Sequence, residues 1–171
     1  MKKIILSAVM VVALAFTAQA QEISKNAIGL RFGSNGGFGT EISYQRALSS
    51  NNRLEVDLGW RNRKDYNNDN YDDNAIKLTA LYQWVWNIDG GFNWYAGIGG
   101  GVGSYNRDYY DDNRIYDNNV FAFAAGNIGI EYNFDIPLLI SLDFRPEFGR
   151  SNGYYNNNYG SDVAVALRYQ F

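Results

Sequence analysis

The 171-residue sequence has no cysteine, no histidine and only two prolines. The lack of cysteine excludes a disulfide framework. The lack of histidine removes the commonest general base, the central residue of Ser-His-Asp triads and the nitrogen ligand of most zinc sites. We therefore expect neither an enzyme nor a cofactor, and we assign no catalytic, cofactor-binding or metal-binding residue.

Positive charge is also scarce. The chain carries 15 lysine and arginine residues against 18 aspartate and glutamate residues, which gives a formal net charge of −3. Nucleic-acid-binding domains are usually basic, so we expect no nucleic-acid partner.

Only one long apolar run is present, and it lies at the start of the chain. Two lysines precede the apolar residues 4–16, and Ala18-Gln19-Ala20 follows as a small-x-small cleavage pattern. This order is typical of a secretory signal peptide. We predict a cleaved signal peptide over residues 1–20 and one domain over residues 21–171. Since no other run has the length of a membrane helix, this domain could cross a membrane only as a closed barrel.

The rest of the chain alternates between apolar and polar residues with the period of a β-strand. Aromatic residues make up 16% of the sequence and glycine occurs 18 times, which also favours strands. Three connections are short (49–52, 87–91 and 135–137). They alternate with four others, of which 34–37 is short and 64–74, 106–119 and 150–161 are long and polar. This order is that of an up-and-down arrangement with tight turns at one end. The predicted strands are 26–33, 38–48, 53–63, 75–86, 92–105, 120–134, 138–149 and 162–171.

One face of each predicted strand is apolar and the other is polar or charged. In strand 53–63, for example, Leu54, Val56 and Leu58 alternate with Glu55 and Asp57. Charges of both signs at mid-strand positions suit a confined interior in which neighbouring strands supply the partners. We predict an interior polar network of Arg31, Glu41, Glu55, Asp57, Arg61, Lys77, Glu131, Asp143, Arg145, Glu147 and Arg168, to which Arg63 adds a sixth positive charge against six negative ones.

The aromatic residues of the apolar face fall mainly near the strand ends, with aliphatic residues between them. Such girdles mark the two interfaces of a membrane-spanning barrel. We predict lipid-interface positions for Tyr44, Trp60, Trp84, Trp86, Trp94, Tyr132, Phe134 and Tyr169, with Phe32, Phe38 and Phe148 toward the long-loop end.

Three features leave alternatives open. A soluble barrel with its apolar face inward would show the same alternation. Phe121 and Phe123 have the opposite phase from Ile128, Ile130 and Tyr132, which a bulge near residues 124–126 would reconcile. Inward glycines in the run 97–103 would leave room for other side chains, for water or for a narrow passage.

The C-terminal residues Val163, Val165, Leu167, Tyr169 and Phe171 look like the sorting signal of bacterial outer-membrane barrels. With its signal peptide and eight strands, the chain resembles small eight-stranded outer-membrane proteins of the OmpX/Ail and OmpA-barrel type. The resemblance implies an all-β, eight-stranded antiparallel up-and-down transmembrane barrel located in the cell outer membrane. It also implies a C-terminal assembly signal of Leu167, Tyr169 and Phe171 for the barrel-assembly machinery, and contact with outer-membrane lipid and lipopolysaccharide.

The long connections are rich in tyrosine, asparagine and aspartate, a composition common in binding loops. We expect a monomer with a structural and adhesin-like role, in which acidic loops contact an extracellular ligand. The alternative is a small porin-like channel of the OmpW type. The loop aspartates (Asp65, Asp69, Asp72, Asp73, Asp108, Asp111, Asp112 and Asp117) offer oxygen ligands for divalent cations but lack EF-hand spacing.

Overall fold

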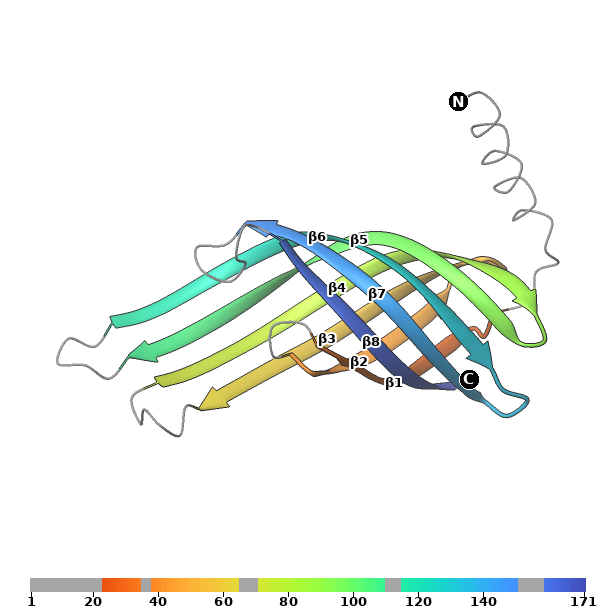
Figure 1. Cartoon of the computed structure of the whole chain (residues 1–171), viewed down its shortest axis with the longest axis horizontal. Helices are drawn as coiled ribbons and strands as arrows, with labels where there is room; N and C mark the ends of the chain where they lie inside the picture. Colours follow the sequence, from red (N-terminus) through yellow and green to blue (C-terminus); the bar gives the residue numbers. More distant parts are fainter. Residues whose placement is uncertain (1–22, 35–37, 65–70, 110–114, 151–158) are drawn as a thin grey trace, which may run out of the picture.

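The computed structural model describes residues 23–34, 38–64, 71–109, 115–150 and 159–171. These residues form eight strands, which are hydrogen-bonded in sequence order and close into a barrel (Figure 1). No described helix is long and apolar enough to cross a membrane. The predicted signal peptide lies outside the described residues. The strands are β1 Asn26–Gly33, β2 Thr40–Ala47, β3 Asn52–Lys64, β4 Tyr71–Asp89, β5 Phe92–Tyr109, β6 Ile115–Asn133, β7 Leu138–Arg150 and β8 Tyr159–Gln170.

The barrel closes between its first and last strands. The seam between β1 and β8 is antiparallel and runs from Ala27 opposite Gln170 to Gly33 opposite Ala164. Just beyond it, the Asn26 N–H donates to the Phe171 carbonyl at 3.0 Å, and the Phe171 N–H donates back at 2.9 Å. A closed ladder leaves no unpaired edge. The predicted fold class, an eight-stranded antiparallel up-and-down barrel, is confirmed.

One end of the barrel has tight turns, as the short predicted connections require. Between β4 and β5, Asp89 lies opposite Phe92 and only Gly90 and Gly91 make the turn. Their φ angles are 56° and 89°, values that glycine adopts without the steric cost of a side chain. We call this the turn end, and the end with connections 34–37, 64–74, 106–119 and 150–161 the loop end.

The strands differ greatly in length. β1 and β2 have 8 residues each, whereas β4 and β6 have 19 and β5 has 18. Figure 1 shows the long strands running past β1 and β2 at the loop end. The expected loops 64–74 and 106–119 are therefore shorter than predicted. Backbone pairing continues through their polar residues, because ladder hydrogen bonds do not require apolar side chains.

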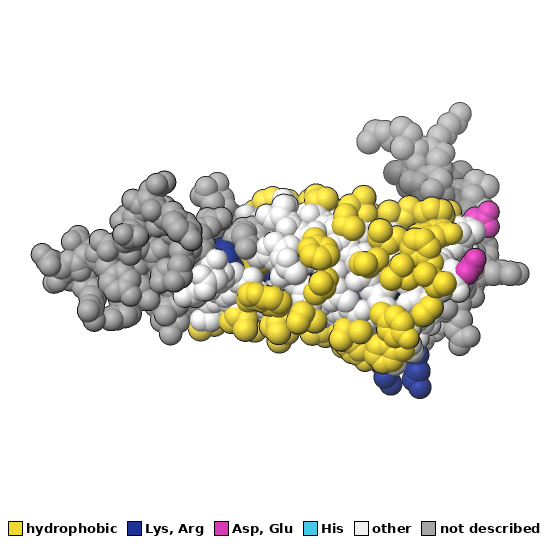
Figure 2. Space-filling model, turned by 90° about the horizontal axis from the view of Figure 1, so that it is seen from below, with side chains coloured by type: hydrophobic (Ala, Val, Ile, Leu, Met, Phe, Trp, Pro, Cys, Tyr) yellow, Lys and Arg dark blue, Asp and Glu magenta, His cyan; other side chains and the backbone are white. Residues whose placement is uncertain are grey.

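Apolar side chains lie on the outer wall and polar ones inside. Leu54, Leu58 and Trp60 are exposed, whereas Glu55 and Asp57 between them are buried. Figure 2 shows hydrophobic side chains over much of the wall. A soluble barrel with an apolar interior is therefore excluded.

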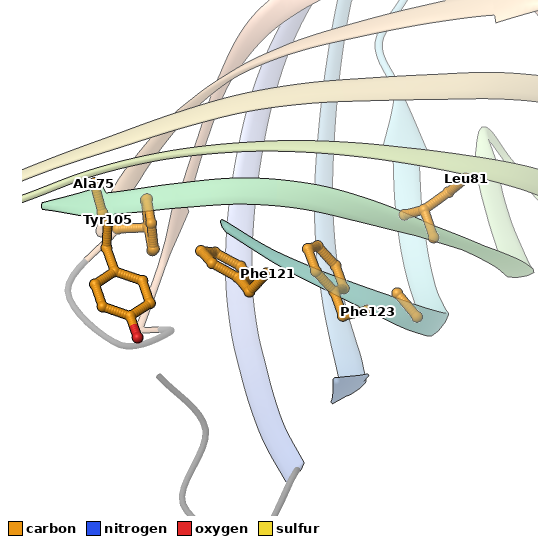
Figure 3. Close-up of a cluster of buried hydrophobic side chains, with 7 residues drawn as sticks. Ala75, Leu81, Tyr105, Phe121 and Phe123 are labelled. Carbon is orange, nitrogen blue, oxygen red and sulfur yellow. The ribbon is translucent and has the colours of Figure 1, made fainter. Parts of the chain in front are cut away.

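The bulge expected near residues 124–126 is absent from the described β6. Pairing with β5 is unbroken from Phe92 opposite Tyr132 to Tyr109 opposite Ile115. Phe121 and Phe123 instead point inward and are buried (Figure 3). The expectation was wrong because these rings fill the space over the glycines of β5.

The same packing accounts for Phe38. The sequence pattern predicted a lipid-facing position for Phe38, but its side chain is 2% exposed and belongs to an apolar cluster inside the barrel. That cluster consists of Phe38, Ala75, Leu81, Tyr105, Phe121, Phe123 and Ala125.

We expect a Cβ atom at Gly101 to destabilise the barrel, because it would meet the Phe123 ring and the Leu78 carbonyl oxygen. Overpacking of this kind typically costs about 1–3 kcal/mol. The matched control is Gly126→Ala, whose Cβ would have its nearest neighbour at 3.7 Å. Urea unfolding in lipid vesicles would measure both free energies, and equal stability of Gly101→Ala and Gly126→Ala would contradict this interpretation.

Candidate functional site

The inward faces of the strands carry a cluster of charged side chains, which we call the interior network. The structure places all eleven predicted members inside the barrel, each no more than 9% exposed. Their burial in one enclosed volume makes ion pairing between strands the main electrostatic feature of the molecule.

Arg145 lies at the centre of the interior network. Its Nη2 donates to Glu55 Oε1 at 2.9 Å and to Asp57, and its Nη1 donates to Glu41 Oε2 at 3.3 Å. One guanidinium on β7 thus binds carboxylates of β2 and β3. The planar donor fork of arginine suits such multiple contacts better than lysine does.

Arg31 on β1 forms a second centre. Its Nη2 donates to Asp143 Oδ1 at 2.6 Å, and its Nη1 donates to Asp162 Oδ2 at 2.6 Å and to Glu41 Oε2 at 3.0 Å. The Tyr95 hydroxyl donates to the other oxygen of Asp143 at 3.2 Å. These contacts connect β1 with β2, β5, β7 and β8.

Glu41 links the two centres and a third cation. Lys77 Nζ lies 3.2 Å from Glu41 Oε1 and 3.0 Å from Glu147 Oε1. The same ammonium lies 5.1 Å from the centre of the Phe38 ring and 5.7 Å from that of Phe123. The charged part of the interior therefore adjoins its aromatic part through cation–π contacts.

Toward the turn end, two more arginines hold carboxylates. Arg168 Nη2 donates to Glu55 Oε2 at 3.1 Å, and its other nitrogens donate to Ser43 and Ser141. Arg53 Nη2 lies 2.7 Å from Glu131 Oε2, with its guanidinium 4.8 Å from the centre of the Tyr95 ring.

Arg53 and Asp162 are members that the sequence analysis missed. Arg53 is 4% exposed and Asp162 is 2% exposed. Asp162 also accepts the Ser34 N–H at 2.6 Å. Both residues are the first of their predicted strands, 53–63 and 162–171. Alternation places Arg53 on the same face as Glu55, and Asp162 on the same face as Ala164, so the sequence contained the signal that both face inward.

The described interior holds more negative than positive side chains. Seven carboxylates face six cations, where the sequence analysis expected six of each with Arg63, whose side chain lies outside the described part. Asp57 Oδ1 has no hydrogen-bond partner among the described residues. The cations are Arg31, Arg53, Arg61, Lys77, Arg145 and Arg168, and the carboxylates are Glu41, Glu55, Asp57, Glu131, Asp143, Glu147 and Asp162.

The apolar cluster occupies the interior at the loop end. The ring centres of Tyr105 and Phe121 are 6.3 Å apart, and those of Phe121 and Phe123 are 6.2 Å apart. Figure 3 shows these rings beside β5. The glycines of β5 give them room, because a Cβ atom at Gly101 or Gly103 would meet the ring of Phe123 or Phe121. At the turn end, Ile23 packs with Val85 and Tyr95. Side chains thus occupy the described interior where a passage was considered.

The predicted interface aromatics lie on the outer wall. Trp60, Trp84, Phe134 and Tyr169 are exposed. Several form ring pairs near the turn end: Trp86 with Trp94 at 4.2 Å, Tyr132 with Phe134 at 4.7 Å, and Tyr169 with Phe171 at 6.3 Å. Tyr44 is half-buried, and its hydroxyl donates to Asn26 Oδ1 at 2.9 Å.

The described residues contain no group of three or more aspartate or glutamate side chains that could hold a metal ion. Of the loop aspartates, Asp65, Asp69, Asp111 and Asp112 lie outside the described residues, and the side chains of Asp72, Asp73, Asp108 and Asp117 lie outside the described part as well.

No family model matches the sequence, and a comparison with curated proteins finds no match. Solved structures do match. Ail, the attachment invasion locus protein of Yersinia pestis, is 13% identical, with a TM-score of 0.56 over 86% of this chain and 97% of Ail. Neisserial surface protein A is 15% identical, with a TM-score of 0.59 over 85% of this chain and 94% of that protein.

The N-terminal barrel domain of Pseudomonas aeruginosa OprF gives a TM-score of 0.61 at 13% identity, over 86% of this chain and 98% of that domain. The chain therefore has the fold of the small eight-stranded outer-membrane barrels, and the resemblance stated from the sequence is confirmed at the level of fold.

We expect Arg145→Met to destabilise the barrel strongly, because it removes the only described ion-pair partner of Asp57 and one partner each of Glu41 and Glu55. Removing one partner from a buried ion pair typically costs about 3–5 kcal/mol. The free energy of unfolding by urea in lipid vesicles measures the effect.

The matched control is Asp57→Asn, which has nearly the same volume and leaves Arg145 with two carboxylates. We expect a loss of about 1 kcal/mol or less, the value of a single hydrogen bond. If Asp57→Asn is as damaging as Arg145→Met, the sharing of Arg145 among three carboxylates is not what stabilises the interior.

Proposed function

We propose that the protein is an integral outer-membrane protein whose barrel anchors a recognition surface at the loop end. The observation that carries the proposal is a wall of exposed apolar side chains around an interior of buried charges. Among the side chains that the structure describes, thirty large hydrophobic residues are exposed, and they include Leu30, Leu58, Leu142 and Val165. Soluble monomers rarely expose apolar patches beyond about 300–600 Å².

The proposed route to the membrane rests on both ends of the chain. Residues 1–20 would direct export and be cleaved. Leu167, Tyr169 and Phe171 would be read by the barrel-assembly machinery. All three are at least 47% exposed on the outer face at the end of β8, where a docking factor could reach them.

A recognition role is supported by the loop end. The long β4, β5 and β6 extend beyond β1 and β2 at the loop end (Figure 1). The connections are rich in tyrosine, asparagine and aspartate, which supply contact area and adaptable hydrogen bonds. We propose that they bind an extracellular ligand and that the protein acts as a monomer.

The charge of these connections limits the ligand. Ail has been crystallised with the heparin analogue sucrose octasulfate. Here residues 64–74 carry a net charge of −3 and residues 106–119 a net charge of −2. These negative charges would repel a polysulfated ligand, so we propose a neutral or basic partner.

Binding is a better proposal than catalysis or transport. The sequence has no histidine to act as a general base. The space beside the glycines of β5, which a porin-like passage would need, holds the rings of Phe121 and Phe123. An eight-stranded barrel is in general just wide enough for side chains to fill.

We expect the purified protein to migrate as a compact band in an unboiled gel and to shift on boiling, because a folded barrel resists detergent. Identical migration with and without boiling would overturn the membrane-barrel proposal.

We expect the same substitution to cost more near the middle of the wall than near its edge. For Leu58→Arg, near the bilayer midplane, the expected loss is about 2–4 kcal/mol, whereas for Leu48→Arg, beside the turn end, it is about 0–1 kcal/mol. Urea unfolding in vesicles measures both. Equal losses would show that the wall does not face lipid.

We expect no discrete openings in planar-bilayer recordings of the wild-type protein, because side chains occupy the described interior. Reproducible single-channel steps would favour the porin-like alternative.

A further inference from the structure

Three described residues, 23–25, precede β1 at the turn end. Ile23 is only 9% exposed, although it lies outside the strands. Its side chain packs with Val85 of β4 and Tyr95 of β5, and the partly buried Ala47 of β2 packs against the same cluster. An apolar side chain from outside the strands thus lies among the inward-facing residues of the barrel.

The position of Ile23 is close to the barrel axis. Besides its packing on β2, β4 and β5, it lines a small cavity of about 10 Å³ together with inward-facing residues of the other strands. A side chain that neighbours inward residues of all eight strands has to lie near the centre of the mouth. The residues of the other five strands that line this cavity include Ala27 of β1, Arg53 of β3, Glu131 of β6, Leu139 of β7 and Gln170 of β8.

Backbone hydrogen bonds fix the chain to the rim of the barrel just after Ile23. The Ala47 N–H donates to the Lys25 carbonyl at 2.9 Å, and the Asn26 N–H donates to the Phe171 carbonyl at 3.0 Å. Two residues span at most about 7 Å. Ile23 therefore stays at the mouth as long as Lys25 is held.

A charged pair lies beside Ile23 in the same cavity. Arg53 Nη2 lies 2.7 Å from Glu131 Oε2, and the two residues are 4% and 2% exposed. Water screens an ion pair and weakens it, whereas a buried pair is screened much less. Ile23 is the apolar residue that separates this pair from the solvent at the turn end.

We propose that residues 23–25 form a lid over the turn end and that the Ile23 side chain is the plug that keeps water from the interior network. Residues 23–25 lie outside the strands, so the lid can open locally while the barrel stays closed. Its opening is then the step that admits water to Arg53 and Glu131. The lid is a property of the closed barrel, whatever lipid surrounds it.

The lack of cysteine makes a direct test possible, because one introduced thiol is the only thiol in the protein. Ala27→Cys places it beside the cavity, at a position that is 3% exposed. The rate of its modification by a charged, water-soluble methanethiosulfonate reagent is measured on the folded protein in detergent. We expect the rate to rise roughly tenfold or more with Ile23→Ala, because the lid loses three buried carbon atoms and opens more easily.

The matched control is Ile28→Ala, which removes the same atoms from an exposed residue of the outer wall and should leave the rate at Ala27→Cys unchanged. A thiol at the loop end, introduced by Ala125→Cys in the apolar cluster, reports on loosening of the whole barrel. If Ala27→Cys does not give a compact gel band, Leu139→Cys, which lines the same cavity, takes its place.

Faster modification at Ala27→Cys alone supports the lid. Equal rates with and without Ile23→Ala would overturn the proposal, because Ile23 would then exclude no water. A rise of the same size at Ala125→Cys would overturn it in favour of a general loss of stability. All rates are measured in detergent, so failure of the proposed outer-membrane location would not change them.

Discussion

The sharing of a few buried cations among carboxylates from several strands is the interaction on which the structure depends. Arg145 binds Glu41, Glu55 and Asp57, and Arg31 binds Glu41, Asp143 and Asp162. An isolated charge in such an interior would carry a large desolvation cost. Because Arg31 and Arg145 each have partners on different strands, the ion pairs stabilise the closed barrel as a whole, and most of the large apolar residues lie on the outer wall.

The interior has two parts with different chemistry. The charged part fills the middle and the turn end, and the apolar cluster fills the loop end. Lys77 belongs to both, since its ammonium binds Glu41 and Glu147 and lies near the rings of Phe38 and Phe123. The glycines of β5 make this division possible, because larger residues there would displace the rings of β6.

The sequence was sufficient to predict the fold, because alternation along a strand records which side chains share a face. The bounds of β1 were predicted without error, and the burial of Glu55, Asp57 and Arg145 follows the alternation. Phe121, Phe123 and Phe38 could not be placed, because an inward aromatic residue and a lipid-facing one have the same hydrophobicity. The phase of Phe121 and Phe123 is that of inward residues, but the space for their rings comes from the pairing of Phe121 with Gly103 and of Phe123 with Gly101, which is a property of the register between strands.

The unequal strand lengths distribute the mechanical strength of the barrel unevenly. β1 has 8 residues, whereas β4 has 19 and β5 has 18. The two seams of β1 therefore hold far fewer ladder hydrogen bonds than the seam between β4 and β5. A sideways pull on the wall would therefore separate the short seams of β1 and β2 before the long seams between β3 and β6. The ion pairs of Arg31 with Asp162 and with Glu41 cross the two seams of β1 and reinforce these short ladders.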